Sequence, residues 1–254
     1  MEINLTEKEK EAVSRSCLAL DVPTVKDALD LVGLLSDYVG IFKVGKELHA
    51  AAGIEGINII GEIENRGGNT FLDLKLHDTP NTVYKTSKAI TVPGVYMFNV
   101  HVAGGEKMCK EAIRGAYEAF GSGKGGKKIP RVIGVTVLTS LSDEDLAEQG
   151  LGIKYDDLVR RRTELAKKWG LAGVVCPANK AGALEKEFGS DLLYVTPGIE
   201  WGGKKGDGQK QLYTPDLAVR DCSNSILVLG SAITKAENKR EAAYEIIKAM
   251  AEYL

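Results

Sequence analysis

Short apolar runs with the length of β-strands alternate with amphipathic stretches with the length of helices along the chain. Such runs are typical of strands buried on both faces, and their alternation with helices indicates a parallel sheet. We predict eight strands, at residues 17–20, 41–44, 70–74, 96–101, 133–138, 173–176, 193–196 and 226–229. We predict helices between them at residues 24–36, 80–91, 105–120, 155–169 and 178–188, and a last helix at 235–253.

Eight strands that alternate with helical stretches in 254 residues match the (β/α)8 TIM barrel, which usually needs about 250 residues. No Pro/Ser-rich linker divides the chain, so we expect one α/β barrel domain over residues 1–254. The competing fold is an open doubly wound sheet that binds a dinucleotide. It would place Gly-x-Gly-x-x-Gly after the first strand, and the chain has no such motif there.

Several protein classes conflict with the composition. No apolar run approaches the roughly 18 residues of a membrane span, and the polar N-terminus lacks a signal sequence, so we expect a cytoplasmic protein. The net charge of −2 argues against a general nucleic-acid binder. The four cysteines include no Cys-x-x-Cys pair, and we expect reduced, buried thiols: Cys17, Cys109, Cys176 and Cys222.

Active sites of this barrel lie at the C-terminal ends of the strands. The residues predicted there include an unusual number of lysines and aspartates. In strand order they are Asp21, Lys43, Asp73, Lys75, Asn99, His101, Thr139, Ser140, Pro177, Pro197, Gly198, Gly230 and Ser231.

The third strand carries the densest group of charges. The pleat predicts that Phe71, Asp73 and Lys75 share one face, with leucines on the other. At about 3.3 Å per residue, the side chains of Asp73 and Lys75 are close enough to meet. A structural ion pair and an active site remain open as explanations.

Asp78 follows the strand and precedes a predicted helix start, with Thr79 as N-cap and Pro80 at the first helical position. By itself Asp78 fits a carboxylate that the helix dipole favours. Together with Lys43, Asp73 and Lys75 it forms an alternating charge array. Such an array keeps a lysine protonated and suits it to donate a proton.

Six segments, in order, resemble the orotidine 5′-phosphate decarboxylase family, particularly its bacterial branch. They are ALD at 19–21, FKVGKE at 42–47, FLDLKLHDTPNT at 71–82, NVH at 99–101, VTVLTS at 135–140 and VTPGI at 195–199. Asp-x-Lys-x-x-Asp alone also occurs in a related sugar-phosphate decarboxylase, so such a paralogue is an alternative. The surrounding Lys-Val-Gly-Lys and Thr-Pro-Asn-Thr make the match more specific.

The resemblance implies decarboxylation of orotidine 5′-phosphate to UMP in pyrimidine biosynthesis, without cofactor or metal. It implies that Lys75 protonates C6 of the pyrimidine, with Asp73 beside the substrate carboxylate. It also implies a homodimer in which Asp78 serves the neighbouring subunit's site. Asp21, Lys43 and Thr82 would hold the ribose, and Thr139 and Ser140 would face the pyrimidine.

The phosphate is expected near Pro197, Gly230 and Ser231, because barrels often bind phosphate after strands seven and eight. The glycine-rich stretch GGKKGDGQ at 202–209 suits a lid, and Gln209 stands where the bacterial family has a phosphate-binding glutamine. The resemblance also implies two arginines near the phosphate, and this chain has Ser231 and Glu200 at those positions. We expect Lys204 or Lys205, with backbone amides near Gly203, Gly230 and Ser231, to compensate in part.

Two other functions deserve comparison. His77, His101, Asp73 and Asp78 suggest a divalent-metal site like that of a sugar-phosphate epimerase, but the ammonium of Lys75 would repel the metal. The basic stretch 121–131 suggests nucleic-acid binding, but it has no aromatic residue for base stacking. We therefore expect no nucleic-acid partner and no membrane partner.

Overall fold

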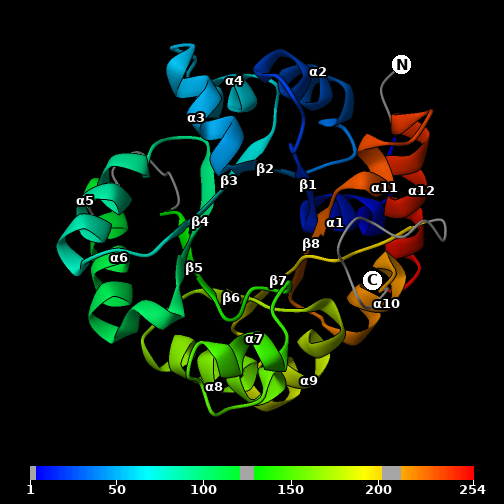
Figure 1. Cartoon of the computed structure of the whole chain (residues 1–254). Coiled ribbons are helices and arrows are strands. Elements are labelled where there is room, and N and C mark those ends of the chain that lie inside the picture. The colour runs from blue at the N-terminus through cyan, green and yellow to red at the C-terminus, as the bar shows by residue number, and fades with distance from the viewer. Residues whose placement is uncertain (1–3, 121–128, 202–212) are drawn as a thin grey trace.

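Eight parallel strands close into a barrel in the computed structural model, which describes residues 4–120, 129–201 and 213–254. Each strand pairs with its neighbours in chain order, and β1 pairs with β8 (Figure 1). The predicted (β/α)8 fold is confirmed. The strands are β1 Ser16–Ala19, β2 Ile41–Gly45, β3 Asn69–Leu76, β4 Val95–His101, β5 Arg131–Val135, β6 Gly173–Val175, β7 Leu193–Thr196 and β8 Ser225–Leu229.

Helices surround the barrel, and α1 packs against α12 beside the junction of β1 and β8 (Figure 1). The helices that precede the glycine-rich stretch 121–128 are α1 Glu7–Arg15, α2 Val25–Leu35, α3 Lys46–Ile54, α4 Ile59–Asn65, α5 Pro80–Ile90, the 3-10 turn η1 Val102–Gly104 and α6 Gly105–Phe120. Those that follow it are α7 Asp143–Glu148, α8 Tyr155–Lys168, α9 Ala178–Phe188, α10 Pro215–Asp221, α11 Ser231–Thr234 and α12 Lys239–Ala251.

Helices α1, α3, α4, α7, α10 and α11 lie outside the predicted helical ranges. The boundaries of the predicted elements lie within two residues of the observed ones, except at the end of β5 and the start of the last helix. Strand β5 ends at Val135 instead of Leu138, because its partner β6 ends at Val175 and leaves no further strand to pair with. The last helix, α12, begins at Lys239 instead of residue 235, where Asn238 caps it by accepting a hydrogen bond from the backbone N–H of Glu241, and the short helix α11 precedes it. These differences leave the order of the elements unchanged.

The apolar side chains form two layers. A small cluster with members on seven of the eight strands fills the inside of the barrel; it consists of Cys17, Ile41, Phe71, Met97, Ile133, Leu193, Val195 and Ile226. A larger cluster joins the outside of the barrel to the helices, including α2 and α12. All four cysteines are free and buried, as predicted.

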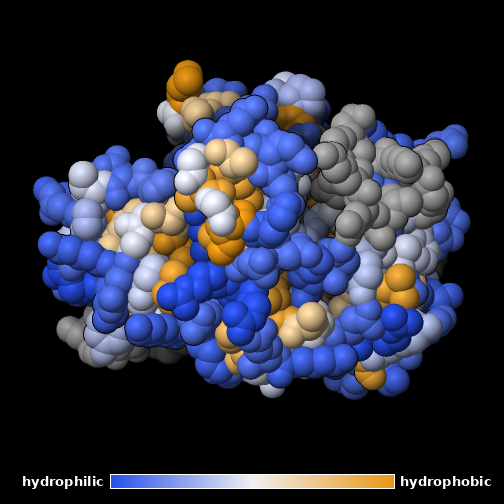
Figure 2. Space-filling model, turned by 60° about the horizontal axis from the view of Figure 1, so that its bottom comes forward, coloured by the Kyte–Doolittle hydropathy of each residue, from blue (hydrophilic) through white to orange (hydrophobic). Residues whose placement is uncertain are grey.

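Hydrophilic residues cover most of the face shown in Figure 2, and apolar residues gather near its middle. The large apolar side chains exposed in the described residues are Leu34, Ile54, Tyr117, Leu138, Tyr244 and Tyr253. None of the helices in the described ranges combines the length and apolar character needed to cross a membrane.

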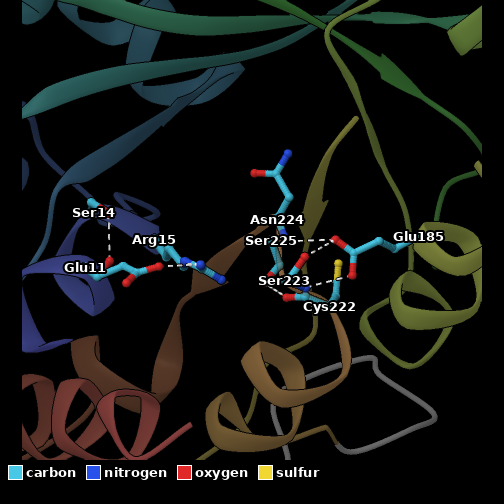
Figure 3. A network of polar contacts seen from close by, with 8 residues as sticks. All are labelled: Glu11, Ser14, Arg15, Glu185, Cys222, Ser223, Asn224 and Ser225. Atoms are coloured by element: carbon cyan, nitrogen blue, oxygen red, sulfur yellow. Dashed lines mark hydrogen bonds and ion pairs between the residues drawn. The ribbon is translucent and has the colours of Figure 1, made fainter. Parts of the chain in front are cut away.

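A network of hydrogen bonds holds residues 223–224, which lead into β8 (Figure 3). The carboxylate of Glu185 on α9 accepts hydrogen bonds from the backbone N–H groups of Ser223 and Asn224 and from the Ser223 hydroxyl. On the other side of the view, Arg15 forms an ion pair with Glu11 in α1. Both groups lie at the N-terminal ends of β1 and β8, where barrels place stabilising contacts, so the candidate site belongs at the opposite end.

Candidate active site

A polar layer lies above the apolar layer inside the barrel. Side chains two residues apart on a strand share a face. The inward apolar residue on each of three neighbouring strands is therefore followed by an inward polar residue two positions later. These pairs are Ile41 and Lys43 on β2, Phe71 and Asp73 on β3, and Met97 and Asn99 on β4.

Four charged side chains form a chain of alternating sign, which runs from Asp21, just after β1, across β2 and β3. Lys43 Nζ lies 3.1 Å from Asp21 Oδ1 and 3.4 Å from Asp73 Oδ2. Lys75 Nζ lies 2.7 Å from Asp73 Oδ1. Each carboxylate oxygen of Asp73 therefore has a lysine ammonium group beside it.

Burial differs along this chain. The side chains of Lys43 and Asp73 are 11% and 13% exposed, whereas that of Asp21 is 68% exposed. Burial by itself lowers the pKa of Lys43, but the charges of Asp73 and Asp21 and the hydrogen bond to Asp21 outweigh it. The pKa of Lys43 is therefore raised above its ordinary value, which keeps this buried lysine charged.

The end of β3 departs from the predicted regular pleat. The pairing of β3 with β4 shifts between Leu72 and Leu76, and Lys75 has a φ of 49°. The prediction that a continuous pleat places Asp73 and Lys75 on one face is therefore wrong in its backbone detail. Their side chains still meet, because the distorted backbone turns Lys75 so that its ammonium reaches Asp73.

Asn99 contacts this distorted segment from β4. Its Oδ1 accepts a hydrogen bond of 2.7 Å from the backbone N–H of Lys75, and its Nδ2 donates one of 2.7 Å to Asp73 Oδ1. The sequence places Asn99 at a strand end but gives no sign of these two bonds. They depend on the register between β3 and β4, which the sequence pattern does not reveal.

Asp78 and Thr82 lie at the start of α5, where Thr79 is the N-cap and Pro80 the first helical residue, as predicted. Asp78 Oδ1 accepts a hydrogen bond of 2.6 Å from the backbone N–H of Thr79, and Thr82 Oγ1 lies 3.0 Å from Thr79 Oγ1. Both residues are exposed. In the described part of the chain, neither forms a hydrogen bond or ion pair with Asp21, Lys43, Asp73 or Lys75.

A cavity of about 190 Å³ lies at the same end of the barrel, beyond β5, β6 and β7. Thr139 and Pro197 line it, and Ser140 is exposed in the turn beside Thr139. Other residues of the lining are Leu141, Tyr155, Pro177, Lys180, Gly198 and Tyr213. Threonine, lysine, tyrosine and proline side chains here offer polar and apolar contacts to a small ligand.

The predicted phosphate residues are described only in part. Gly230 precedes α11 and Ser231 is its first residue, directly after β8; both are partly buried. Glu200, which replaces an expected arginine, is buried just after β7. Gln209, Lys204, Lys205 and Gly203 lie outside the described residues, as does the stretch 121–128.

His77 follows β3 and His101 ends β4, and their ring centroids lie 5.2 Å apart. Burial, followed by the charges of His77 and Lys75, lowers the pKa of His101 to about 4. Zinc sites are built from three or four ligand side chains grouped together. The described residues contain no such group of histidine, cysteine, aspartate or glutamate, so the imagined site at His77, His101, Asp73 and Asp78 is not formed there.

Known bacterial proteins resemble the chain over nearly its full length. Orotidine 5′-phosphate decarboxylase from Heliobacterium modesticaldum is 39% identical over 247 residues, which cover 96% of this chain and 98% of the relative. The enzyme of the same name from Aliivibrio fischeri is 40% identical over 237 residues, covering 93% and 97%. The similarity therefore includes the barrel and the candidate site.

The fold is also similar to a solved structure of the same kind. The crystal structure of orotidine 5′-phosphate decarboxylase from Lactobacillus acidophilus matches with a TM-score of 0.80 and 33% identity, covering 92% of this chain and 98% of that one. The family model described as "Orotidine 5'-phosphate decarboxylase / HUMPS family" matches residues 14–246. The chain belongs to the orotidine 5′-phosphate decarboxylase / HUMPS family.

Proposed function

We propose that the protein decarboxylates orotidine 5′-phosphate to UMP in pyrimidine biosynthesis, without a cofactor or metal. One observation carries this proposal beyond family membership: the Lys75 ammonium lies 2.7 Å from Asp73 Oδ1 at the catalytic end of the barrel. A lysine in this setting is a charged proton donor. It is poorly suited to act as a neutral amine nucleophile.

In the proposed reaction, the bond between C6 of the pyrimidine and its carboxylate breaks, and carbon dioxide leaves. The electron pair of that bond stays on C6, and the Lys75 ammonium supplies the proton that forms the new C6–H bond. Asp73 lies beside the substrate carboxylate in this arrangement. A preorganised ammonium stabilises the negative charge that develops at C6, so it acts more strongly on the transition state than on the ground state.

The remaining contacts in the proposal hold the substrate. Asp21 and Lys43, with Thr82, bind the ribose hydroxyls, while Thr139 and Ser140 face the pyrimidine ring. The location of Thr139 in the cavity beyond β5 supports its part of this assignment. Binding energy from ribose and phosphate then serves to position C6 against Lys75.

The phosphate is assigned to the ends of β7 and β8, near Pro197, Gly230 and Ser231, with Gln209 from the glycine-rich stretch. Ser231 replaces an arginine that would grip phosphate with two hydrogen bonds. We propose that Lys204 or Lys205 contributes the positive charge instead. Backbone amides near Gly203, Gly230 and Ser231 complete the proposed phosphate site.

We further propose a cytoplasmic homodimer with shared active sites. Asp78 is exposed at the start of α5, and in the described residues it forms no ion pair with Lys75 of its own chain. An exposed carboxylate at this place is available to a neighbouring subunit. It would extend the alternating charge array beyond Lys75 of the partner.

The direct test uses orotidine 5′-phosphate labelled in its carboxyl group. The proposal predicts labelled carbon dioxide and an equal amount of UMP. A carboxylated sugar phosphate serves as the alternative substrate, because a related decarboxylase shares Asp-x-Lys-x-x-Asp. Turnover of the sugar phosphate without turnover of orotidine 5′-phosphate would overturn the proposed function and favour a paralogue.

A further inference from the structure

Asn99 is a buried amide that touches two neighbouring residues of the proposed charge array. It lies on β4 with none of its surface exposed. Its two hydrogen bonds, each 2.7 Å long, reach the backbone N–H of Lys75 and the carboxylate of Asp73. A buried polar side chain with all its partners inside one site holds that site in a fixed geometry.

The two partners of Asn99 need one acceptor and one donor at this position. A backbone N–H can only donate a hydrogen bond, and an ionised carboxylate can only accept one. A carboxamide offers one acceptor and one donor on a single flat group, so Asn99 satisfies both partners. Aspartate has the same shape but would place an acceptor against Asp73, and leucine would satisfy neither partner.

The bond to Lys75 supports an unusual backbone conformation. Lys75 is the one non-glycine residue with a positive φ among those the structure describes. Residues with a side chain rarely adopt this left-handed region. The shift in pairing between β3 and β4 takes Lys75 out of the regular hydrogen-bond ladder between the strands. Asn99 Oδ1 accepts the hydrogen bond from its backbone N–H instead.

The bond to Asp73 fixes the direction of the carboxylate. Asp73 Oδ1 accepts from both Asn99 Nδ2 and Lys75 Nζ, whereas Asp73 Oδ2 faces Lys43. Asn99 therefore holds one carboxylate oxygen toward Lys75. It also holds the backbone from which the Lys75 side chain starts.

We propose that Asn99 is a positioning residue for the decarboxylation, which fixes the Lys75 backbone and the Asp73 carboxylate as one unit. This inference rests on the proposed function, because it assigns Asn99 a task in that reaction. Asn99 acts through Lys75 and Asp73 and needs no contact with the substrate. Its loss should therefore lower kcat far more than it changes KM.

The test compares two variants of similar size. Asn99→Leu removes both hydrogen bonds, and Asn99→Asp keeps the acceptor for Lys75 but loses the donor to Asp73. A misplacement of about 1 Å in an active site costs about 100-fold in rate, so we expect kcat to fall by about that factor in Asn99→Leu. KM for orotidine 5′-phosphate should stay close to the wild-type value. If Asn99→Leu does not fold, Asn99→Asp provides the same comparison of kcat and KM.

The matched control is Ser16→Ala at the opposite end of the barrel. Ser16 is also fully buried, and its hydroxyl contacts the backbone carbonyls of Val13 and Tyr38. This variant also loses buried hydrogen bonds, so its stability should fall while kcat and KM remain unchanged. A loss of kcat in the control equal to that in the Asn99 variants would indicate a general structural effect and overturn the inference.

Crystal structures of the wild type and the Asn99 variants provide a readout that needs no activity. Asn99→Leu should move Lys75 out of the left-handed region or lengthen the contact between Lys75 Nζ and Asp73 Oδ1. An unchanged Lys75 backbone and Asp73 carboxylate would overturn the inference, as would an unchanged kcat. A wild type that is inactive on orotidine 5′-phosphate would overturn the proposed function, and with it the task assigned to Asn99 in that reaction. The crystal structures would still show whether Asn99 holds the Lys75 backbone and the Asp73 carboxylate in place.

Discussion

Replacing Asp73 by asparagine tests whether the charge array stabilises the folded barrel. The variant keeps the size of the side chain and removes the negative charge between Lys43 and Lys75. The Lys43 side chain is 11% exposed, so its ammonium would lose its one well-buried counter-charge. We expect Asp73→Asn to lower the free energy of unfolding.

The magnitude follows from the geometry. At 3.4 Å, and with an effective dielectric constant of about 20, the attraction between Lys43 and Asp73 is about 5 kcal/mol. Breaking a buried pair by removing one partner costs roughly 3–5 kcal/mol. Asp21 remains 3.1 Å from Lys43 but is 68% exposed, so solvent screens it and it offsets less than about 1 kcal/mol. The expected loss is therefore about 3 kcal/mol.

A double-mutant cycle isolates the pair. Asp73→Asn, Lys43→Met and the double variant are unfolded in urea and followed by circular dichroism. The double variant should lose less stability than the two single losses added together, with a coupling of about 2 kcal/mol. Additivity within about 0.5 kcal/mol, or an Asp73→Asn variant as stable as the wild type, would show that the Lys43 and Asp73 charges do not stabilise the barrel.

The exposed pair of Lys26 and Asp30 is a matched control. Their charged atoms are closer, at 2.6 Å, but the side chains are 82% and 63% exposed. Solvent screening leaves such an exposed helix pair only a small part of the effect expected at Asp73. Asp30→Asn should therefore change stability by no more than that, which shows whether burial or distance sets the effect at Asp73.

Three further outcomes are expected. Ser231→Arg should tighten UMP binding by about tenfold, or roughly 1.4 kcal/mol, and leave uridine binding unchanged in calorimetric titrations; no gain for UMP would place the phosphate elsewhere. The pKa of His101 is lowered to about 4, so the folded chain binds fewer protons than the unfolded chain below about pH 6.5, and stability should fall as the pH falls from 6.5 through 4. The thermal unfolding temperature of His101→Gln should depend less on pH in that window than that of the wild type. An equal pH dependence would contradict the lowered pKa of His101. Mixing inactive Asp78→Asn with inactive Lys75→Ala should restore some activity in mixed dimers, and no recovery would argue against shared sites.

The sequence predicted the fold well because the barrel depends on a simple repeated pattern. Buried strands read as apolar runs, and each observed strand overlaps a predicted one. The cap at Asn238, where α12 begins, is a local signal that the prediction did not use. The end of β5 was harder, because it depends on a contact with another strand: β5 ends where β6 stops pairing. Local patterns carry little information on such contacts.

The sequence also revealed some features of the candidate site and not others. Asp21, Lys43, Asp73 and Lys75 were visible because charged residues are uncommon at buried strand ends. The left-handed backbone of Lys75 and the two bonds of Asn99 were not visible, because they arise from the shifted pairing of β3 and β4. A regular strand is the default expectation, and only the folded register reveals this departure from it.

Lys75 supplies the proton in the proposed decarboxylation, and the release of labelled carbon dioxide measures this role. Wild type, Lys75→Ala and the control Lys85→Ala, which alters an exposed lysine on α5, are compared with carboxyl-labelled orotidine 5′-phosphate. We expect wild type and Lys85→Ala to release label at similar rates and Lys75→Ala to release it at least about 100-fold more slowly, the lower range for a general acid. Turnover by Lys75→Ala at the wild-type rate would contradict this role.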